Sequence, residues 1–217
     1  MSKYAKITLL ALGSVAALMT MPVNAAAVKC SEFGGFIPAG IHDYNIIVDV
    51  DCHVSGGAIV NGNISESRNT DYSIYVFSTG IVNGNIEEKG PGLVFVDVGH
   101  NQLYIGNIWE RGDGNVYVLV DGVFYGEVVE QNEGDVDVQV YGGCPSAGPG
   151  LFIGSTVEKG PGDAYLGVSE GESPCWQDGT YEGDFTEKGP GNCYIKEHTL
   201  SELPTVQINC ATLVWPD

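Results

Sequence analysis

The stretch VNGNIEEKGPGLVFVDV at residues 82–98 decides the fold, because its pattern returns along most of the chain. Each copy has a glycine followed four residues later by a glutamate, and successive copies are 22, 22, 20, 28 and 29 residues apart. A period in this range is typical of one supersecondary unit stacked on its neighbours. The glycines are Gly62, Gly84, Gly106, Gly126, Gly154 and Gly183, and the glutamates are Glu66, Glu88, Glu110, Glu130, Glu158 and Glu187.

Each copy predicts two β-strands. The first runs through the glycine to the glutamate, as in residues 82–88 and 104–110. The second alternates strictly, as in 94–98, 116–120 and 136–140, and this alternation with β-branched residues is typical of a strand with one buried face. Lys-Gly-Pro-Gly turns at 89–92, 159–162 and 188–191 separate the strands. The chain is therefore predicted to be all-β.

The expected architecture is a disulfide-stapled β-solenoid of about six to seven two-strand coils, with ~20–22 residues in each coil. The rival is an antiparallel sandwich, which has no need for the same residue types at the same place in every unit. We expect an N-terminal cap at 28–58, the repeats at 59–197 and a C-terminal cap at 198–217.

Residues 1–25 have the features of a cleaved signal peptide. Lys3 and Lys6 precede an apolar run, and Val23-Asn24-Ala25 provides a small-x-small cleavage site. The formal charge of the whole chain is −19, and losing residues 1–25 removes two lysines and no acids. We expect a secreted, cell-surface or periplasmic protein with no transmembrane segment in the mature chain and no nucleic-acid partner, because like charges repel.

Six cysteines in an exported chain favour three disulfides over a metal site. Cys144 and Cys175 lie in insertions at the same corner of adjacent repeats, so they are expected to pair. Cys193 takes an inward strand position and is expected to pair with Cys210, which leaves Cys30 with Cys52 to fasten the N-terminal cap.

The string IWERGDGN at residues 108–115 resembles the curlin repeat of bacterial curli fibres. That repeat has the outline apolar-x-Gln-x-Gly-x-Gly-Asn followed by an alternating strand, and residues 187–192, 88–92 and 158–162 fit the same frame. The resemblance covers roughly residues 59–197. It implies an exported subunit of extracellular cross-β fibres that serve biofilm formation and adhesion.

The chain departs from curlins in placing Glu where their ladder has Gln. Two carboxylates about 4.8 Å apart repel by roughly 3–4 kcal/mol at an effective dielectric of ~20. The six glutamates could be solvated at the corner, accepting from turn N–H groups and from Lys89, Arg111, Lys159 or Lys188. They could instead be protonated, with a raised pKa, or bind a cation such as Ca²⁺. All three alternatives stay open at this point.

Aromatic residues form two columns in the aligned repeats. The outward column, which Asp137 interrupts, could bind sugar rings or a partner protein, or could stabilise neighbouring coils by stacking. Its candidate binding residues are Phe95, Tyr117, Tyr165 and Tyr194. The second column, Tyr104, Phe124, Phe152 and Tyr181, is predicted to lie in the core, with the repeat glycine making room for its rings.

No residue pattern indicates an enzyme or a resident cofactor. The four histidines are scattered, and no nucleophile triad or phosphate-binding loop is present in the sequence. The sequence predicts a non-enzymatic structural or adhesive repeat protein that associates with itself or with a host or matrix surface. The alternative is a soluble secreted module that binds glycan or calcium.

Overall fold

The computed structural model describes residues 26–142, 148–169, 179–197, 206–210 and 213–214. The described chain winds into a stack of parallel β-strands, and the one helical segment within it is the short 3-10 helix η2 (Cys30–Phe33). Every strand pairing is parallel, which excludes the antiparallel sandwich and confirms the all-β solenoid.

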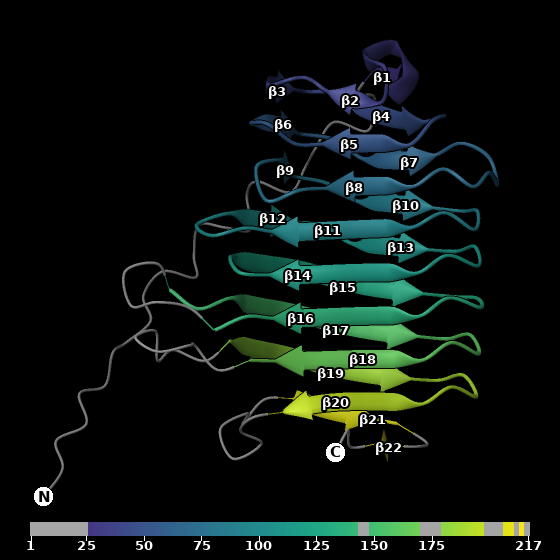
Figure 1. The fold of residues 1–217 in the computed structure, drawn as a ribbon, viewed down its shortest axis with the longest axis vertical. Helices are drawn as coiled ribbons and strands as arrows, with labels where there is room; N and C mark the ends of the chain where they lie inside the picture. Colours follow the sequence, from purple (N-terminus) through teal and green to yellow (C-terminus); the bar gives the residue numbers. More distant parts are fainter. Residues whose placement is uncertain (1–25, 143–147, 170–178, 198–205, 211–212, 215–217) are drawn as a thin grey trace, which may run out of the picture.

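Three sheets run along the stack, which stands vertically in Figure 1. Sheet A follows the path β1 (Ala27–Lys29), β4 (Asn45–Val48), β7 (Ile64–Glu66), β10 (Ile86–Glu88), β13 (Ile108–Glu110), β15 (Val123–Glu130), β17 (Leu151–Glu158), β19 (Thr180–Glu187) and β21 (Val206–Asn209), with β12 (Leu103–Ile105) beside β15. Sheet B contains β2 (Phe36–Ile37), β5 (Cys52–Val54), β8 (Ile74–Val76), β11 (Val94–Val98), β14 (Val116–Val120), β16 (Val136–Val140), β18 (Ala164–Val168), β20 (Cys193–Glu197) and β22 (Leu213–Val214). The small sheet C contains β3 (Gly40–His42), β6 (Ala58–Val60) and β9 (Ile81–Val82).

The stack is longer than the repeats alone predict. Strands β1 to β5 come from the segment expected to be the N-terminal cap, and β21 and β22 come from the segment expected to be the C-terminal cap. These strands extend sheets A and B at both ends, so the repeat motif marks the middle of a more extensive solenoid.

Alternating side chains build the core between sheets A and B. In β14, Val116, Val118 and Val120 are fully buried while the residues between them are partly exposed. The same alternation occurs in β11 and β16, and β13 contributes the buried Ile108 from the facing sheet. Since the registers align like residues, each inner position forms a continuous apolar column along the stack.

The repeat glycines lie at the corner where the coil turns into sheet A. In β15, β17 and β19 the strand continues through this corner at Gly126, Gly154 and Gly183, which have positive φ angles of 156°, 152° and 146°. A Cβ on Gly154 would lie 1.6 Å from the carbonyl oxygen of Gly126 on the preceding coil. The expectation that these glycines make room for aromatic rings is therefore wrong, because the group that needs the space is the backbone of the neighbouring coil.

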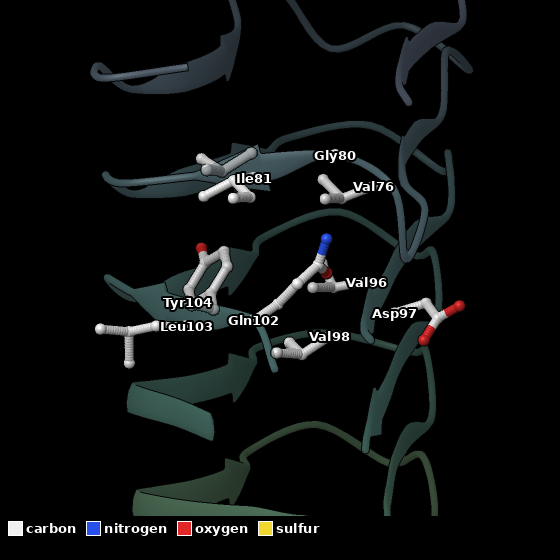
Figure 2. Close-up of a pocket in the computed structure, with 10 residues that line it drawn as sticks. Val76, Gly80, Ile81, Val96, Asp97, Val98, Gln102, Leu103 and Tyr104 are labelled. Atoms are coloured by element: carbon white, nitrogen blue, oxygen red, sulfur yellow. The ribbon is translucent and has the colours of Figure 1, made fainter. Parts of the chain in front are cut away.

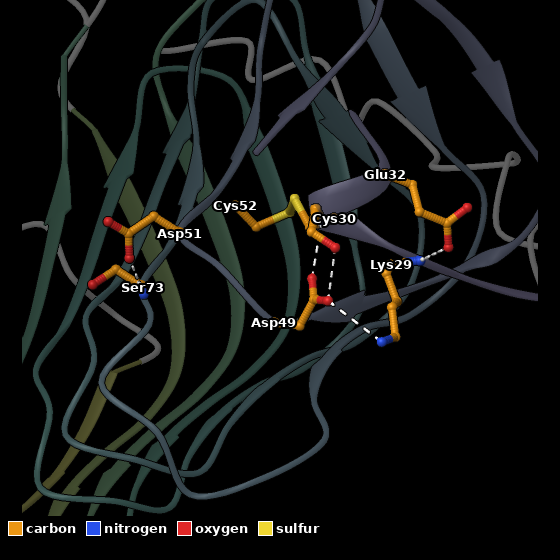
Figure 3. Close-up of a disulfide and its surroundings, with 8 residues drawn as sticks. Lys29, Cys30, Glu32, Asp49, Asp51, Cys52 and Ser73 are labelled. Atoms are coloured by element: carbon orange, nitrogen blue, oxygen red, sulfur yellow. Dashed lines mark hydrogen bonds and ion pairs between the residues drawn. A yellow bond between two sulfur atoms is a disulfide. The ribbon is translucent and has the colours of Figure 1, made fainter. Parts of the chain in front are cut away.

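The N-terminal end of the stack is fastened by the disulfide Cys30–Cys52, whose Cα atoms are 5.8 Å apart (Figure 3). Asp49 accepts hydrogen bonds from the backbone N–H and the hydroxyl of Ser31, and Lys29 Nζ lies 3.7 Å from Asp49 Oδ2. Partial burial acts to raise the pKa of Asp49, but these hydrogen bonds and the lysine lower it overall. Together the contacts hold η2 against the first coils.

The second predicted disulfide that lies among the described residues, Cys193–Cys210, is also present, with 6.0 Å between its Cα atoms. Cys193 pairs in register with Ala164 and is fully buried, as its inward strand position predicts. The expected partners Cys144 and Cys175, and the expected signal peptide at 1–25, lie outside the described residues.

Candidate functional site

The six repeat glutamates form one buried ladder at the ends of the sheet A strands. The registers pair Glu88 with Glu110, Glu110 with Glu130, Glu130 with Glu158 and Glu158 with Glu187. Five of the six side chains are fully buried, and Glu187 is 4 % exposed. The alternation of the strands places each glutamate on the same inner face as the buried residue two positions before it, which is Ile86 in β10.

One oxygen of each carboxyl group is held by the turn that follows it. The backbone N–H two residues after the glutamate donates to Oε1 over 2.6 to 2.8 Å in Glu88, Glu110, Glu130, Glu158 and Glu187. The other oxygen, Oε2, is buried in these five glutamates and receives no hydrogen bond from an N–H or hydroxyl donor. Each therefore keeps one acceptor without a protein donor, an arrangement that is costly for a charged group.

The first glutamate differs from the others. Glu66 Oε1 accepts from both the backbone N–H and the hydroxyl of Thr70, and Glu66 Oε2 accepts from the backbone N–H of Lys89. Both of its oxygens are thus satisfied by the protein, so the demand for further donors begins with Glu88 on the next coil.

Burial and neighbouring carboxyl groups favour the protonated acids. Burial, the largest cause, raises the pKa of Glu88 to about 7, and the pKa values of Glu110 and Glu158 are higher still. The pKa of Glu187 is raised by burial as well. The neighbouring side chains of Glu88 and Glu130 also raise the pKa of Glu110. One carboxyl group can donate a hydrogen bond to the next only when it carries a proton. Protonated in this way, the ladder has the donor and acceptor pattern of a Gln ladder.

The expectation that these glutamates are solvated at the corner is wrong. Their side chains are sealed in the core, and the part of that expectation that holds is the bond from the turn N–H. Two of the four expected basic partners pair elsewhere: Lys89 Nζ lies 3.3 Å from Glu87 Oε2, and Arg111 Nε lies 3.1 Å from Glu87 Oε1. Glu87 points outward, where solvation is available.

The arrangement of the described side chains does not support the hypothesis that the glutamate ladder binds calcium. Within the described part of the chain, no group of three or more His, Cys, Asp and Glu side chains is arranged to hold a metal ion. A role of the repeat glutamates as metal ligands therefore stays a hypothesis.

The outward aromatic column lies on sheet B and is longer than the sequence predicts. The registers align Phe36, His53, Tyr75, Phe95, Tyr117, Asp137, Tyr165 and Tyr194. Of the missed members, Phe36 and His53 lie in strands of the segment expected to be a cap, and Tyr75 lies in β8 of the first repeat. Aligning those short strands on their apolar alternation could have found them.

Stacking occupies much of this column. His53 stacks on Phe36 at 4.5 Å and on Tyr75 at 4.8 Å between ring centroids, and Tyr165 stacks on Tyr194 at 4.7 Å. Each stacked ring has at least one face covered by a neighbour, which leaves its edge toward solvent. This arrangement favours the stabilisation of neighbouring coils over a platform of free ring faces.

The second aromatic column is confirmed as core. Tyr104, Phe124 and Phe152 are at most 2 % exposed and stack with centroid separations of 4.8 and 4.7 Å, and Tyr181 continues the stack at 4.6 Å. Burial raises the pKa of Tyr104 and Tyr181. This column fills the core behind the glycine corner with closely stacked rings.

Two polar ladders were missed by sequence reasoning. Asn45, Asn63 and Asn85 each accept, through Oδ1, the backbone N–H of the equivalent residue one coil later at 2.9 Å. At the start of the sheet B strands, Asn115, Asp135 and Asp163 do the same over 2.7 to 2.8 Å. The Gly-Asn pairs at 62–63, 84–85 and 106–107 are the signal that could have revealed the first ladder.

A small pocket lies between the coils that contain β9 and β12 (Figure 2). Its lining includes the apolar side chains Val76, Val96 and Val98 together with Gln102, and it has roughly the space of one water molecule. Asp97 and Tyr104 also belong to the lining, but the space is too small to admit a substrate larger than water.

Comparison of the chain with protein-family models, curated proteins and solved structures found no match. The described residues contain no helix that is both long and apolar enough to cross a membrane. The two disulfides fit a protein that works outside the reducing cytosol.

Proposed function

We propose that this protein is an exported, non-enzymatic structural protein that acts as an adhesive scaffold at the cell surface or outside the cell. The observation that carries the proposal is the unbroken stack itself. Side chains of one kind align over successive coils, and a disulfide fastens each end. Such a rod presents extended rows of side chains, which suits attachment better than chemistry.

Adhesion is tested directly by coating beads with the oxidised protein lacking residues 1–25. Retention under flow would be measured on anionic, cationic and apolar surfaces, with albumin-coated beads as the control. We expect retention on at least one surface well above the albumin level. If the coated beads wash off every surface as albumin-coated beads do, the adhesive proposal is wrong.

The curlin resemblance adds a proposal about assembly. Native disulfides and a net charge of −19 oppose end-to-end pairing of edge strands, so the oxidised chain should stay monomeric at neutral pH. Light scattering and thioflavin fluorescence should then detect fibres after reduction at pH 4, where both obstacles are weakened. A chain that stays monomeric under all these conditions would exclude curli-like assembly and leave the soluble glycan- or calcium-binding module to be tested.

A further inference from the structure

An exposed apolar patch lies on the corner of the solenoid opposite the glutamate turns. Strands β12, β15 and β17 align Leu103 with Val123 and Leu151, and Ile105 with Tyr125 and Ile153. We refer to these six residues as the apolar patch. Leu103 is 46 % exposed and Tyr125 is 49 % exposed, and the other four are half-buried. Figure 2 shows the Leu103 side chain at the outer edge of the pocket, pointing in a different direction from Tyr104, although both residues line it.

A column of aliphatic residues extends the patch toward the N-terminal end. Ile41 pairs with Ile59 and Ile59 pairs with Ile81 in sheet C. The bridge between Asn83 and Ile105 then places β12 next to β9. Ile41 is 67 % exposed. Exposed apolar side chains this regular are unusual in a chain with 28 acidic residues, and contiguous patches of this kind mark interaction sites.

The rim of the patch is acidic. Glu182 lies in register beside Ile153, Asp121 precedes Val123 by two residues, and Glu127 and Asp184 follow the glycine corner. Strands β12, β15, β17 and β19 contain no Lys or Arg. His100 Nδ1 lies 3.4 Å from Asp121 Oδ2, but none of the ion pairs among the described residues brings a Lys or Arg to these four acids.

We infer that the apolar patch docks a basic polypeptide segment that presents aliphatic side chains between lysines or arginines. The inference deepens the proposed adhesive role and rests on it. A patch of two residues on three coils measures roughly 7 by 10 Å, which suits two or three inserted side chains. The acidic rim supplies the charge complementarity that selects a basic partner. A second copy of this chain would bring an identical acidic rim, and anionic lipid is repelled in the same way.

Synthetic peptides test the inference. Three immobilised peptides of equal length would alternate Lys with Val, Lys with Ser, and Glu with Val, and binding would be measured by surface plasmon resonance near physiological salt. The wild-type protein should bind the Lys-Val peptide at least about tenfold more tightly than the other two. The double variant Leu103→Ser/Tyr125→Ser should lose at least about tenfold of that affinity. The variant Phe36→Ser, which removes a 60 % exposed ring from another face, is the matched control and should bind as the wild type does.

The possible failures are distinguishable. Equal binding of the Lys-Val and Lys-Ser peptides, or unchanged binding by the double variant, would overturn the docking site. A wild-type dimer in light scattering that the double variant converts to a monomer would also overturn it, since a second copy would then occupy the patch. Bead retention measured with the same variants reports on the adhesive role separately: retention without peptide binding removes only the docking site. Thermal melts of each variant confirm that the fold is kept.

Discussion

At the residue scale, the glutamate ladder is the least conventional feature of the molecule. A Gln side chain would satisfy the same turn N–H and also donate to the next coil, whereas Glu needs a bound proton to do so. The glutamates of the five later coils each keep a buried Oε2 without a protein donor. The ladder therefore links the stability of the fold to pH.

The free energy of unfolding should fall as pH rises above the ordinary glutamate range. The folded-state pKa values are raised from 4.5, to about 7 at Glu88 and higher at Glu110 and Glu158. A group whose pKa rises on folding stabilises the fold fully below its unfolded pKa, and this contribution is lost as pH rises through the folded pKa. Thermal melts should give a midpoint about 5 °C or more higher at pH 5 than at pH 9. A midpoint that is higher at pH 9 would contradict a protonated ladder.

The substitution Glu110→Gln should stabilise the protein at pH 8 by about 1–3 kcal/mol, because the amide donates to the next coil without taking up a proton. It should also flatten the dependence of stability on pH. Urea unfolding at pH 5 and pH 8 measures both effects. Glu87→Gln is the matched control, since Glu87 points outward beside Lys89 and Arg111, and it should change stability by no more than about 0.5 kcal/mol. A destabilised Glu110→Gln protein at pH 8 would show that the ladder works in its charged form.

At the scale of the element, the glycine corner sets how closely successive coils approach. The bent strands β15, β17 and β19 cross this corner without a break in pairing, which joins the sheet C side of the coil to sheet A. The corner tolerates no side chain because a carbonyl oxygen of the previous coil occupies the space.

The substitution Gly154→Ala should destabilise the protein by at least about 3 kcal/mol, because the new Cβ meets the Gly126 carbonyl oxygen and φ is +152°. Gly56→Ala provides the comparison: φ is +60° there, but nothing lies within 4 Å of the added Cβ. It should cost about 1 kcal/mol. Urea denaturation measures both, and equal losses would mean that backbone conformation, and not the contact between coils, decides the cost.

At the scale of the whole molecule, a solenoid is a one-dimensional stack in which each coil contacts its neighbours alone. The ends are consequently the weakest places, and each described disulfide lies at one of them. Cys30–Cys52 joins residues 22 apart, and Cys193–Cys210 joins residues 17 apart.

Replacing Cys30 and Cys52 together by Ser should cost about 2–4 kcal/mol. Hydrogen exchange should accelerate most in β1, β2 and β4, and progressively less along the stack, because the terminal coil opens first. Mass spectrometry of exchanged peptides measures this gradient, with the protection of β14 as the internal reference. Uniform acceleration through β14 would instead indicate that the stack unfolds in one cooperative step.

The sequence by itself determined the solenoid, its inward valines, the buried aromatic column and two of the disulfides. Apart from the Cys30–Cys52 pairing, which followed by elimination, each depends on local alternation combined with a regular repeat. Residues 116–120 alternate in only one way, and a stacked unit must put the same residue type at the same place on every coil.

The tertiary structure decided the environment of the glutamates and the positions of the surface columns. The alternation of residue types predicts that Glu110 faces the core, whereas the cost of burying a charge predicts that it faces solvent. The structure buries it, because the N–H of Gly112 donates to one carboxyl oxygen and the neighbouring carboxyl groups favour the uncharged acid. The apolar patch arises because β12, β15 and β17 align residues 20 to 28 positions apart, across connections of unequal length. The residues of the patch become neighbours only through the pairing register of these strands, and the register is fixed when the coils stack.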